Sequence, residues 1–255
     1  AVAFHDACRE KGLKPILGCE VYVAPASRFE RQAQSASDAY NHFTLLATSD
    51  AGYHNLIKLV SAGYLEGFYH RPRIDKDLLA RHREGLIGLS GCLSGEIAQH
   101  ILAGAEDAAL ASVGVFSEIL GKDRFYLEVM EHGIPDQRRV NQGLLRVRQK
   151  TGLKLAATND AHYLHRDDHH AHDVLLCIGS GKKVGDAERL RFDTNHFYLK
   201  SGEEMAGLFP DHPEALSSTV QIAEMCDFTL KGVSTLPAFD VAPGFTTFSY
   251  FEKVT

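Results

Sequence analysis

Residues 124–158, RFYLEVMEHGIPDQRRVNQGLLRVRQKTGLKLAAT, hold the pattern that decides the fold. The apolar runs at 124–130 and 153–158 have the length and composition of buried strands. Between them, apolar side chains recur with the helical period over 136–150, and Gly152 lies where such a helix ends. A strand, a helix and a second strand in this order predict two parallel strands joined by a helical crossover.

The rest of the chain repeats this alternation. Further strands are expected at 15–23, 42–47 and 85–90, with a polar loop over 27–40. Helices are expected at 2–11, 49–64, around Leu78, 94–102, 107–120, 166–178 and 214–226. This order predicts an α/β protein whose parallel strands are covered by helices, as a barrel or an open sheet. No strand is followed by a P-loop or GxGxxG pattern, so nucleotide binding by those motifs is not expected.

The composition is that of a globular protein. The 255 residues are 44% hydrophobic and 24% charged, with a net charge of −6. No apolar run is long enough to span a membrane, and residues 1–10 carry charge and lack a signal-type apolar stretch, so secretion is not expected. The five cysteines have no paired spacing, which indicates a reducing, cytoplasmic setting. The acidic balance argues against general duplex binding, although a local basic groove remains possible.

The beginning of the chain is unusual. It opens with AVAF over residues 1–4, without Met, and the first expected helix resembles the interior of a domain. These features indicate a fragment of a longer protein.

Five side chains of metal-ligand type lie beside the expected strands: Glu20, His42, Cys92, Asp160 and His162. The last three follow strand ends, where α/β barrels gather their functional groups. Asp160 and His162 are two residues apart, so an extended backbone points both side chains the same way. Nitrogen, oxygen and sulfur donors in this pattern predict a site for zinc or a similar cation.

Each of these residues also has an ordinary explanation. Cys92 alone suits a small buried apolar side chain, His42 a histidine at a strand edge, and the Asp160–His162 pair a loop cap. Glu20 is harder to explain in this way, because a carboxylate in an apolar strand is costly without a cation or donors. The joint pattern favours a metal centre.

The segments around these residues resemble the later motifs of the PHP (polymerase and histidinol phosphatase) domain. They are GCEVYV (18–23), HFTLLA (42–47), SGCLSGE (90–96) and TNDAHY (158–163). Four more segments resemble the PHP region of bacterial replicative DNA polymerase III alpha subunits: YLEGFY (64–69), RPRID (71–75), AHDVLLC (171–177) and FYLKS (197–201). The resemblance covers nearly the whole chain.

The resemblance implies a distorted (β/α)7 barrel that is incomplete here, with its first two strands and their His-x-His and Asp-His motifs missing. Residues 1–180 would form the partial barrel, 181–230 the end of the PHP region with its C-terminal helix, and 231–255 a linker toward a polymerase palm that is absent. The positions that match the family's metal ligands are Glu20, His42, Cys92, Asp160 and His162. The metal would be zinc or manganese, with magnesium at the absent palm.

The resemblance also implies a function. The parent would be a DNA-directed DNA polymerase that uses DNA and deoxynucleoside triphosphates, with partners such as a sliding clamp and a proofreading exonuclease and no membrane. This part would be its metal-binding domain, either a 3′–5′ exonuclease or a scaffold for the proofreading exonuclease. The alternative is a standalone metal-dependent phosphoesterase similar to histidinol phosphatase.

Three further residues are candidates for a supporting role. His132 follows the fourth expected strand and is a candidate to support a ligand or contact a phosphate, with an ordinary loop histidine as the alternative. Arg71 and Arg73 are candidates for contact with a DNA backbone or a neighbouring polymerase domain. A plain charged loop is the default explanation for both arginines.

Overall fold

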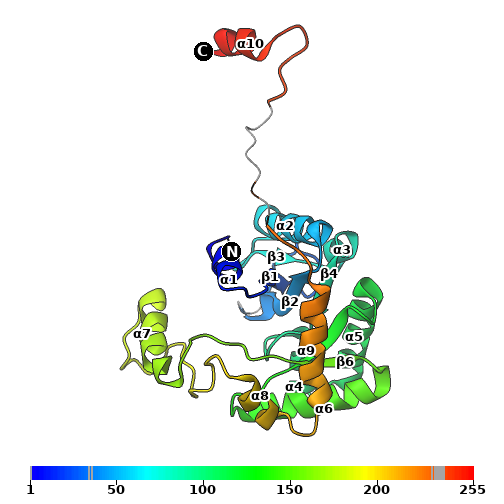
Figure 1. The fold of residues 1–255 in the computed structure, drawn as a ribbon, viewed down its shortest axis with the longest axis vertical. Helices are drawn as coiled ribbons and strands as arrows, with labels where there is room; N and C mark the ends of the chain where they lie inside the picture. Colours follow the sequence, from blue (N-terminus) through cyan, green and yellow to red (C-terminus); the bar gives the residue numbers. More distant parts are fainter. Residues whose placement is uncertain (1, 34, 36, 231, 233–238) are drawn as a thin grey trace.

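The centre of the molecule is a six-stranded sheet with helices packed against it (Figure 1). The computed structural model describes residues 2–33, 35, 37–230, 232 and 239–255. The strands are β1 (Gly18–Val23), β2 (Asn41–Ala47), β3 (Arg73–Ile74), β4 (Leu86–Leu89), β5 (Phe125–Val129) and β6 (Lys154–Ala157). Their order is β3-β1-β2-β4-β5-β6, so the sheet is open, with β3 and β6 at its edges. This architecture confirms the expected α/β class and is compatible with an incomplete barrel.

Strand β2 runs against its neighbours. It pairs antiparallel with β1 and with β4, whereas β1–β3, β4–β5 and β5–β6 are parallel pairs. The expectation that all strands are parallel is therefore wrong for β2. Among the described residues between β1 and β2, the 3-10 turn Ser37–Ala39 is the only helical element, so these residues supply no crossover helix and the chain returns antiparallel. As a result, the amino end of β2 lies at the same end of the sheet as the carboxyl ends of the other strands.

Ten α-helices lie in the described residues. They are α1 (Val2–Glu10), α2 (Asp50–Leu65), α3 (Lys76–Arg81), α4 (Glu96–Leu102), α5 (Glu106–Leu120), α6 (Pro135–Thr151), α7 (His169–Ser180), α8 (Gly202–Leu208), α9 (Pro213–Met225) and α10 (Thr247–Val254). The 3-10 turn Arg166–Asp168 precedes α7. All the expected helices are present. None of the described helices is long and apolar enough to cross a membrane.

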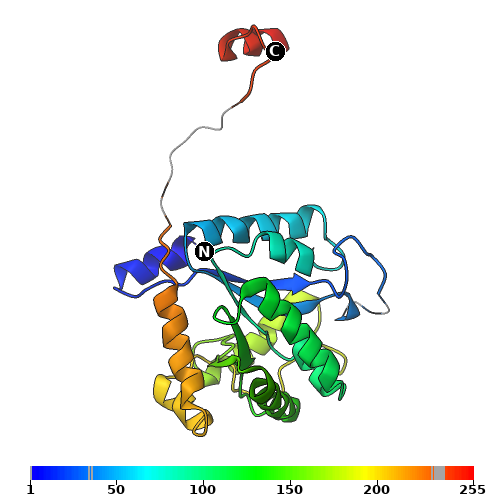
Figure 2. The same ribbon diagram turned by 90° about the vertical axis from the view of Figure 1, so that its right-hand side faces the viewer.

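The sheet carries an apolar cluster on each face. The larger cluster joins β2, α2, α5 and α6 through residues such as Phe43, Leu59, Phe116 and Leu144. The smaller cluster includes Ile87, Leu89, Tyr126, Ala156 and Ile222. Figure 2 shows α2 (light blue) across one side of the strands, while α9 (orange) packs against β6. Along β2, buried residues alternate with partly buried ones, so the face that carries the larger cluster is the more fully covered.

Three elements were not expected from the sequence. Strand β3 has two residues and α8 has seven, which is too short for a clear periodic signal. Helix α10 lies within the expected linker at 231–255 and begins with a capping box between Thr246 and Ser249. Residues 231 and 233–238 of that expected linker are outside the described residues. In both views α10 (red) lies apart from the sheet.

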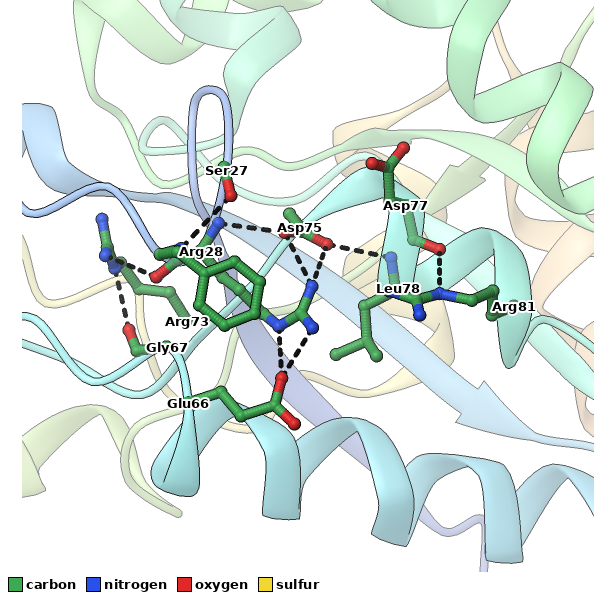
Figure 3. A network of polar contacts seen from close by, with 10 residues as sticks. Ser27, Arg28, Glu66, Gly67, Arg73, Asp75, Asp77, Leu78 and Arg81 are labelled. Carbon is green, nitrogen blue, oxygen red and sulfur yellow. Dashed lines mark hydrogen bonds and ion pairs between the residues drawn. The ribbon is translucent and has the colours of Figure 1, made fainter.

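A buried ionic network holds the loop between β1 and β2 (Figure 3). Asp75 accepts a hydrogen bond from the Arg28 backbone nitrogen at 2.9 Å and pairs with Arg28 Nη1 at 3.0 Å. Asp75 also caps α3 by accepting from Leu78 N at 2.9 Å. On the other side, Arg28 Nη2 lies 2.6 Å from Glu66 Oε2. One carboxylate therefore fixes the loop and the start of a helix together.

Arg73 belongs to the same network. Only 3% of Arg73 is exposed, and its guanidinium donates to four backbone carbonyls, those of Arg28, Glu30, Ala39 and Gly67. The expectation that Arg73 contacts a DNA backbone is therefore wrong, because all three of its side-chain nitrogens are used inside the protein. Arg73 instead ties residues 28–39 to the strand β3.

Candidate metal centre

The five predicted ligands line a single cavity. Its volume is about 610 Å³, and Glu20, His42, Cys92, Asp160 and His162 all lie on its wall, together with His132. The cavity lies at the end of the sheet where the carboxyl ends of β1, β4 and β6 meet the amino end of β2. The reversal of β2 explains how a residue at a strand start joins residues that follow strand ends.

His42 contacts both Glu20 and Cys92. The His42 Nδ1 atom lies 3.0 Å from Glu20 Oε1 and 3.5 Å from Cys92 Sγ. Gly91 makes this approach possible: its φ is +85°, and a Cβ there would lie 2.5 Å from the His42 carbonyl oxygen. The His42 backbone nitrogen also donates to Ser94 O at 3.0 Å. The turn after β4 is thus held against the start of β2.

These contacts set the charge of His42. Burial acts to lower the pKa of its imidazole, but hydrogen bonds to Cys92 and Glu20 outweigh burial and raise that pKa to about 10. The imidazole is therefore cationic at neutral pH. Because a metal ligand must be a neutral imidazole, binding of a cation here would release a proton.

Asp160 and His162 form the second part of the site. Asp160 Oδ1 lies 3.4 Å from His162 Nε2. Burial acts to raise the pKa of Asp160, yet the hydrogen bond to His162 lowers it overall, and the same bond raises the pKa of His162. Asp160 has φ +45°, an uncommon backbone conformation for a non-glycine residue. The surrounding structure must therefore hold this turn in place.

Asn159 provides that support. Its side chain donates to Tyr198 O at 2.9 Å and accepts from Lys200 Nζ at 3.0 Å, while its carbonyl accepts from His132 Nε2 at 3.0 Å. His132 is 2% exposed and stacks on Phe197 with ring centroids 4.1 Å apart. Two roles were expected for His132, support of a ligand or contact with a phosphate. The geometry fits the first, because His132 bonds the backbone next to Asp160. Burial lowers the pKa of His132, as it does that of Lys200.

Glu128 is a neighbour that sequence reasoning missed. It lies in β5, where every residue is buried, and it is only 4% exposed. Its carboxylate accepts from Gly91 N at 3.0 Å and from Thr158 Oγ1 at 2.7 Å, so it bridges the backbone next to Cys92 and the strand end before Asp160. Loss of hydration raises its pKa to about 7. The available signal was a carboxylate inside an apolar strand, the same signal that drew attention to Glu20.

The chemistry of the five donors suits a divalent metal. Two imidazoles, two carboxylates and one thiol are the ligand types that zinc takes, and Mn²⁺ accepts the oxygen and nitrogen donors. In the described parts of the chain, no three His, Cys, Asp or Glu side chains form a group that could hold a metal ion. The donors instead contact each other, with His42 Nδ1 shared between Glu20 and Cys92. The fit to a metal therefore rests on the donor set and its common cavity.

Comparison with known proteins gives two findings. The profile of the PHP domain matches residues 1–132, a range that contains Glu20, His42 and Cys92. The DNA polymerase III subunit alpha of Borreliella burgdorferi is 44% identical over 259 residues, which cover 100% of this chain and 22% of that protein. The subunit of Thermus aquaticus is 44% identical over 263 residues, with the same coverage. That of Treponema pallidum is 40% identical over 254 residues, 99% of this chain and 22% of the relative.

These matches differ in what they establish. The chain spans about a fifth of the length of these curated relatives, since each alignment covers 22% of the relative. Asp160 and His162 lie beyond the PHP profile but inside the segment that the relatives match. The profile covers more than half of the chain, and the chain therefore belongs to the PHP domain family.

Proposed function

We propose that this chain is the PHP part of a DNA polymerase III alpha subunit and binds a divalent metal, zinc or manganese, in the cavity at its sheet edge. The observation that carries the proposal is that Glu20, His42, Cys92, Asp160 and His162, from four separate segments, line the same cavity. The identity of 44% to the alpha subunit of Borreliella burgdorferi over the full chain supports the assignment to this subunit.

The whole-protein function follows from that assignment and is part of the proposal. The parent protein would extend DNA from deoxynucleoside triphosphates in the cytoplasm, with magnesium at a palm site outside this chain. It would work with other replicative subunits, including a sliding clamp and a proofreading exonuclease. Residues 1–180 would form the partial barrel and 181–230 the end of the PHP region.

We propose hydrolysis of a phosphodiester at a 3′ end as the reaction of this site. A bound divalent cation supplies Lewis acidity to the phosphodiester and to water. The chain would hold it through Glu20, His42 and Cys92 on one side and Asp160 and His162 on the other. His132 and Lys200 would orient the Asp160 turn through Asn159, because they bond its carbonyl and its side chain. The Glu20 Oε1 atom, 3.0 Å from His42 Nδ1, is placed to accept a hydrogen bond from that imidazole and so to orient its ring.

Metal content tests the proposal. The protein would be incubated with zinc or manganese, dialysed, and analysed by mass spectrometry beside the variant Asp160→Ala/His162→Ala. Loss of two ligands is expected to weaken metal binding at least about tenfold, equivalent to roughly 1.4 kcal/mol. The variant Asp167→Ala/His169→Ala is a matched control, because it removes an exposed Asp-x-His pair outside the cavity wall.

The outcomes separate the competing functions. Metal that is retained by the control and lost by the double variant supports the centre, and release of nucleotides from a 3′-labelled oligonucleotide would then demonstrate the nuclease. Absence of metal from the unmodified chain would contradict the centre and leave a scaffold for a separate proofreading enzyme. Hydrolysis of histidinol phosphate in preference to DNA would indicate the standalone phosphoesterase instead.

A further inference from the structure

A cluster of aromatic rings and one arginine lies beside the Glu20–His42 end of the candidate metal centre. The rings of Tyr22 and Tyr40 are 4.7 Å apart and nearly perpendicular, at 66°. Tyr22 lies 5.2 Å from the His42 ring, and Tyr40 is parallel to His42 at 6.0 Å. The Arg71 guanidinium carbon is 6.0 Å from the centre of the Tyr22 ring. Arg71 is exposed, and both tyrosines are half-buried.

The fold holds this cluster in place from two sides. Tyr22 is the register partner of His42 and lies two residues after Glu20, so these side chains share one face of the sheet. Buried Arg73 donates to the Ala39 carbonyl at 3.1 Å, next to Tyr40, and lies two residues from Arg71. Arg73, which Figure 3 shows within the polar network, therefore holds the backbone next to Tyr40 and close to Arg71.

The turn that presents Arg71 is itself constrained. Tyr69 N donates to Arg71 O at 3.0 Å, and His70 between them has φ +60°. Such a conformation costs free energy in a non-glycine residue and persists where surrounding contacts impose it. The turn thus holds Arg71 at the protein surface next to the rings.

The charge of Arg71 is available to a ligand. Other arginines on the surface, such as Arg139 and Arg146, pair with carboxylates of Asp136 and Glu106. In the described part of the chain no ion pair with a carboxylate is found for Arg71. Its hydrogen bond to Tyr40 raises its pKa.

We propose that Tyr22, Tyr40 and Arg71 form a binding site for single-stranded nucleic acid that positions a strand end beside Glu20 and His42. Phenol rings stack on unpaired bases of any sequence, and a guanidinium binds the phosphate backbone. Paired bases are stacked within a duplex and would not be free to contact the rings, so the site is specific for single strands. The positioning of a strand end rests on the proposed function, whereas the stacking requires no metal.

Fluorescence anisotropy with a labelled oligothymidylate of about 12 nucleotides tests this site, in EDTA so that the metal centre does not contribute. Tyr22→Ala and Tyr40→Ala are each expected to weaken binding about 5- to 100-fold, because each removes a stacking partner. Tyr22→Phe and Tyr40→Phe keep the ring and are expected to stay within about twofold of the unmodified protein. Arg71→Gln is expected to reduce the slope of log Kd against log salt by about 0.7.

Phe248→Ala and Arg81→Ala are matched controls, because both side chains are exposed, on α10 and α3, and neither lines a cavity that Glu20 or Tyr22 lines, so their loss should leave binding unchanged. Unchanged affinity in both alanine variants, or no binding by the unmodified chain, would overturn the site. If an alanine variant fails to fold, the phenylalanine variants and Arg71→Gln still test the site through the affinity and the salt dependence given above. The unmodified protein is expected to bind the oligonucleotide in EDTA whether or not it retains zinc or manganese in the metal analysis. If the metal analysis finds no bound metal while the oligonucleotide still binds, the proposed nuclease function is wrong, but the single-strand binding site stands.

Discussion

Glu128 shows how strongly the fold controls the protonation of a single residue. Its carboxyl group is buried between the ends of β4 and β6 and accepts two hydrogen bonds, yet loss of hydration raises its pKa to about 7. A carboxyl group whose pKa is higher in the folded than in the unfolded state binds more protons when folded. Its favourable contribution to stability is therefore complete below about pH 4.5 and is lost as pH rises through 7.

We expect Glu128→Gln to remove this pH dependence. The pKa of about 7 against an unfolded value near 4.5 corresponds to a loss on the order of 3 kcal/mol between pH 4 and pH 8. A glutamine stays uncharged, and the Thr158 hydroxyl can rotate to accept from its amide. Urea unfolding across this pH range in EDTA measures the effect, with exposed Glu118→Gln as control. Parallel stability profiles for Glu128→Gln and the unmodified protein would refute the expectation.

The sequence selected candidate residues that share one cavity, but it did not select the residues that support them. Glu20, His42, Cys92, Asp160 and His162 could be selected because each is a polar residue beside an apolar strand, and all five line one cavity. Lys200 could not, because its burial depends on Asn159 and on the His196 carbonyl, which only the folded chain brings together. Arg73 was misjudged for the same reason, since its four carbonyl partners come from loops with no sequence signal.

At the scale of elements, the Arg28–Asp75 contact joins a long loop to a helix. Replacing Asp75 by Asn keeps a cap for α3 but leaves Arg28 with only the half-exposed Glu66. We expect Asp75→Asn to lower the free energy of unfolding by about 2 to 4 kcal/mol, because it breaks a buried ion pair from one side. Chemical denaturation at pH 7 measures the loss.

A surface ion pair provides the control for that prediction. Asp136→Asn removes an exposed pair with Arg139 at i, i+3 and is expected to cost less than about 0.5 kcal/mol. Equal losses for Asp75→Asn and Asp136→Asn would mean that burial adds nothing to the Arg28–Asp75 contact.

Element type was predictable where the periodic pattern was long, as in α2, α5 and α6. Strand direction was not predictable by the same means, because an apolar run has the same pattern in a parallel or an antiparallel pair. The informative segment was 27–40, which was expected to be a polar loop. Its described residues form no α-helix that could cross over the sheet, and β2 therefore turns back. Strand β3 gave no signal because its two residues owe their pairing to β1.

At the scale of the whole molecule, the last described segment is separate from the packed core. The hydrogen bonds described for residues 239–255 join them to one another, and Phe248, Phe251 and Val254 on α10 are more than half exposed. In contrast, Leu230 N donates to buried His5 at 3.3 Å and so connects with α1.

Deletion of residues 239–255 is therefore expected to leave stability unchanged, with a shift in Tm below about 2 °C. Thermal unfolding followed by circular dichroism measures this. A deletion that starts at residue 227 would also remove the Leu230–His5 bond and the Asp227 N to Thr48 O bond at 3.1 Å, and it should lower Tm clearly. A large loss of Tm from the shorter deletion would show that α10 contributes to the core.

The reversal of β2 also has a consequence for the order of folding. Glu20 and His42 belong to one antiparallel pair whose closure needs only the loop 24–40, whereas Cys92 and the Asp160–His162 pair reach the cavity after long helical crossovers. Closing a short loop costs less chain entropy than closing a long one, and contacts of low sequence separation form faster. The Glu20–His42 contact can therefore form as soon as β1 and β2 have emerged during synthesis, whereas the Asp160–His162 pair must wait for more than a hundred further residues.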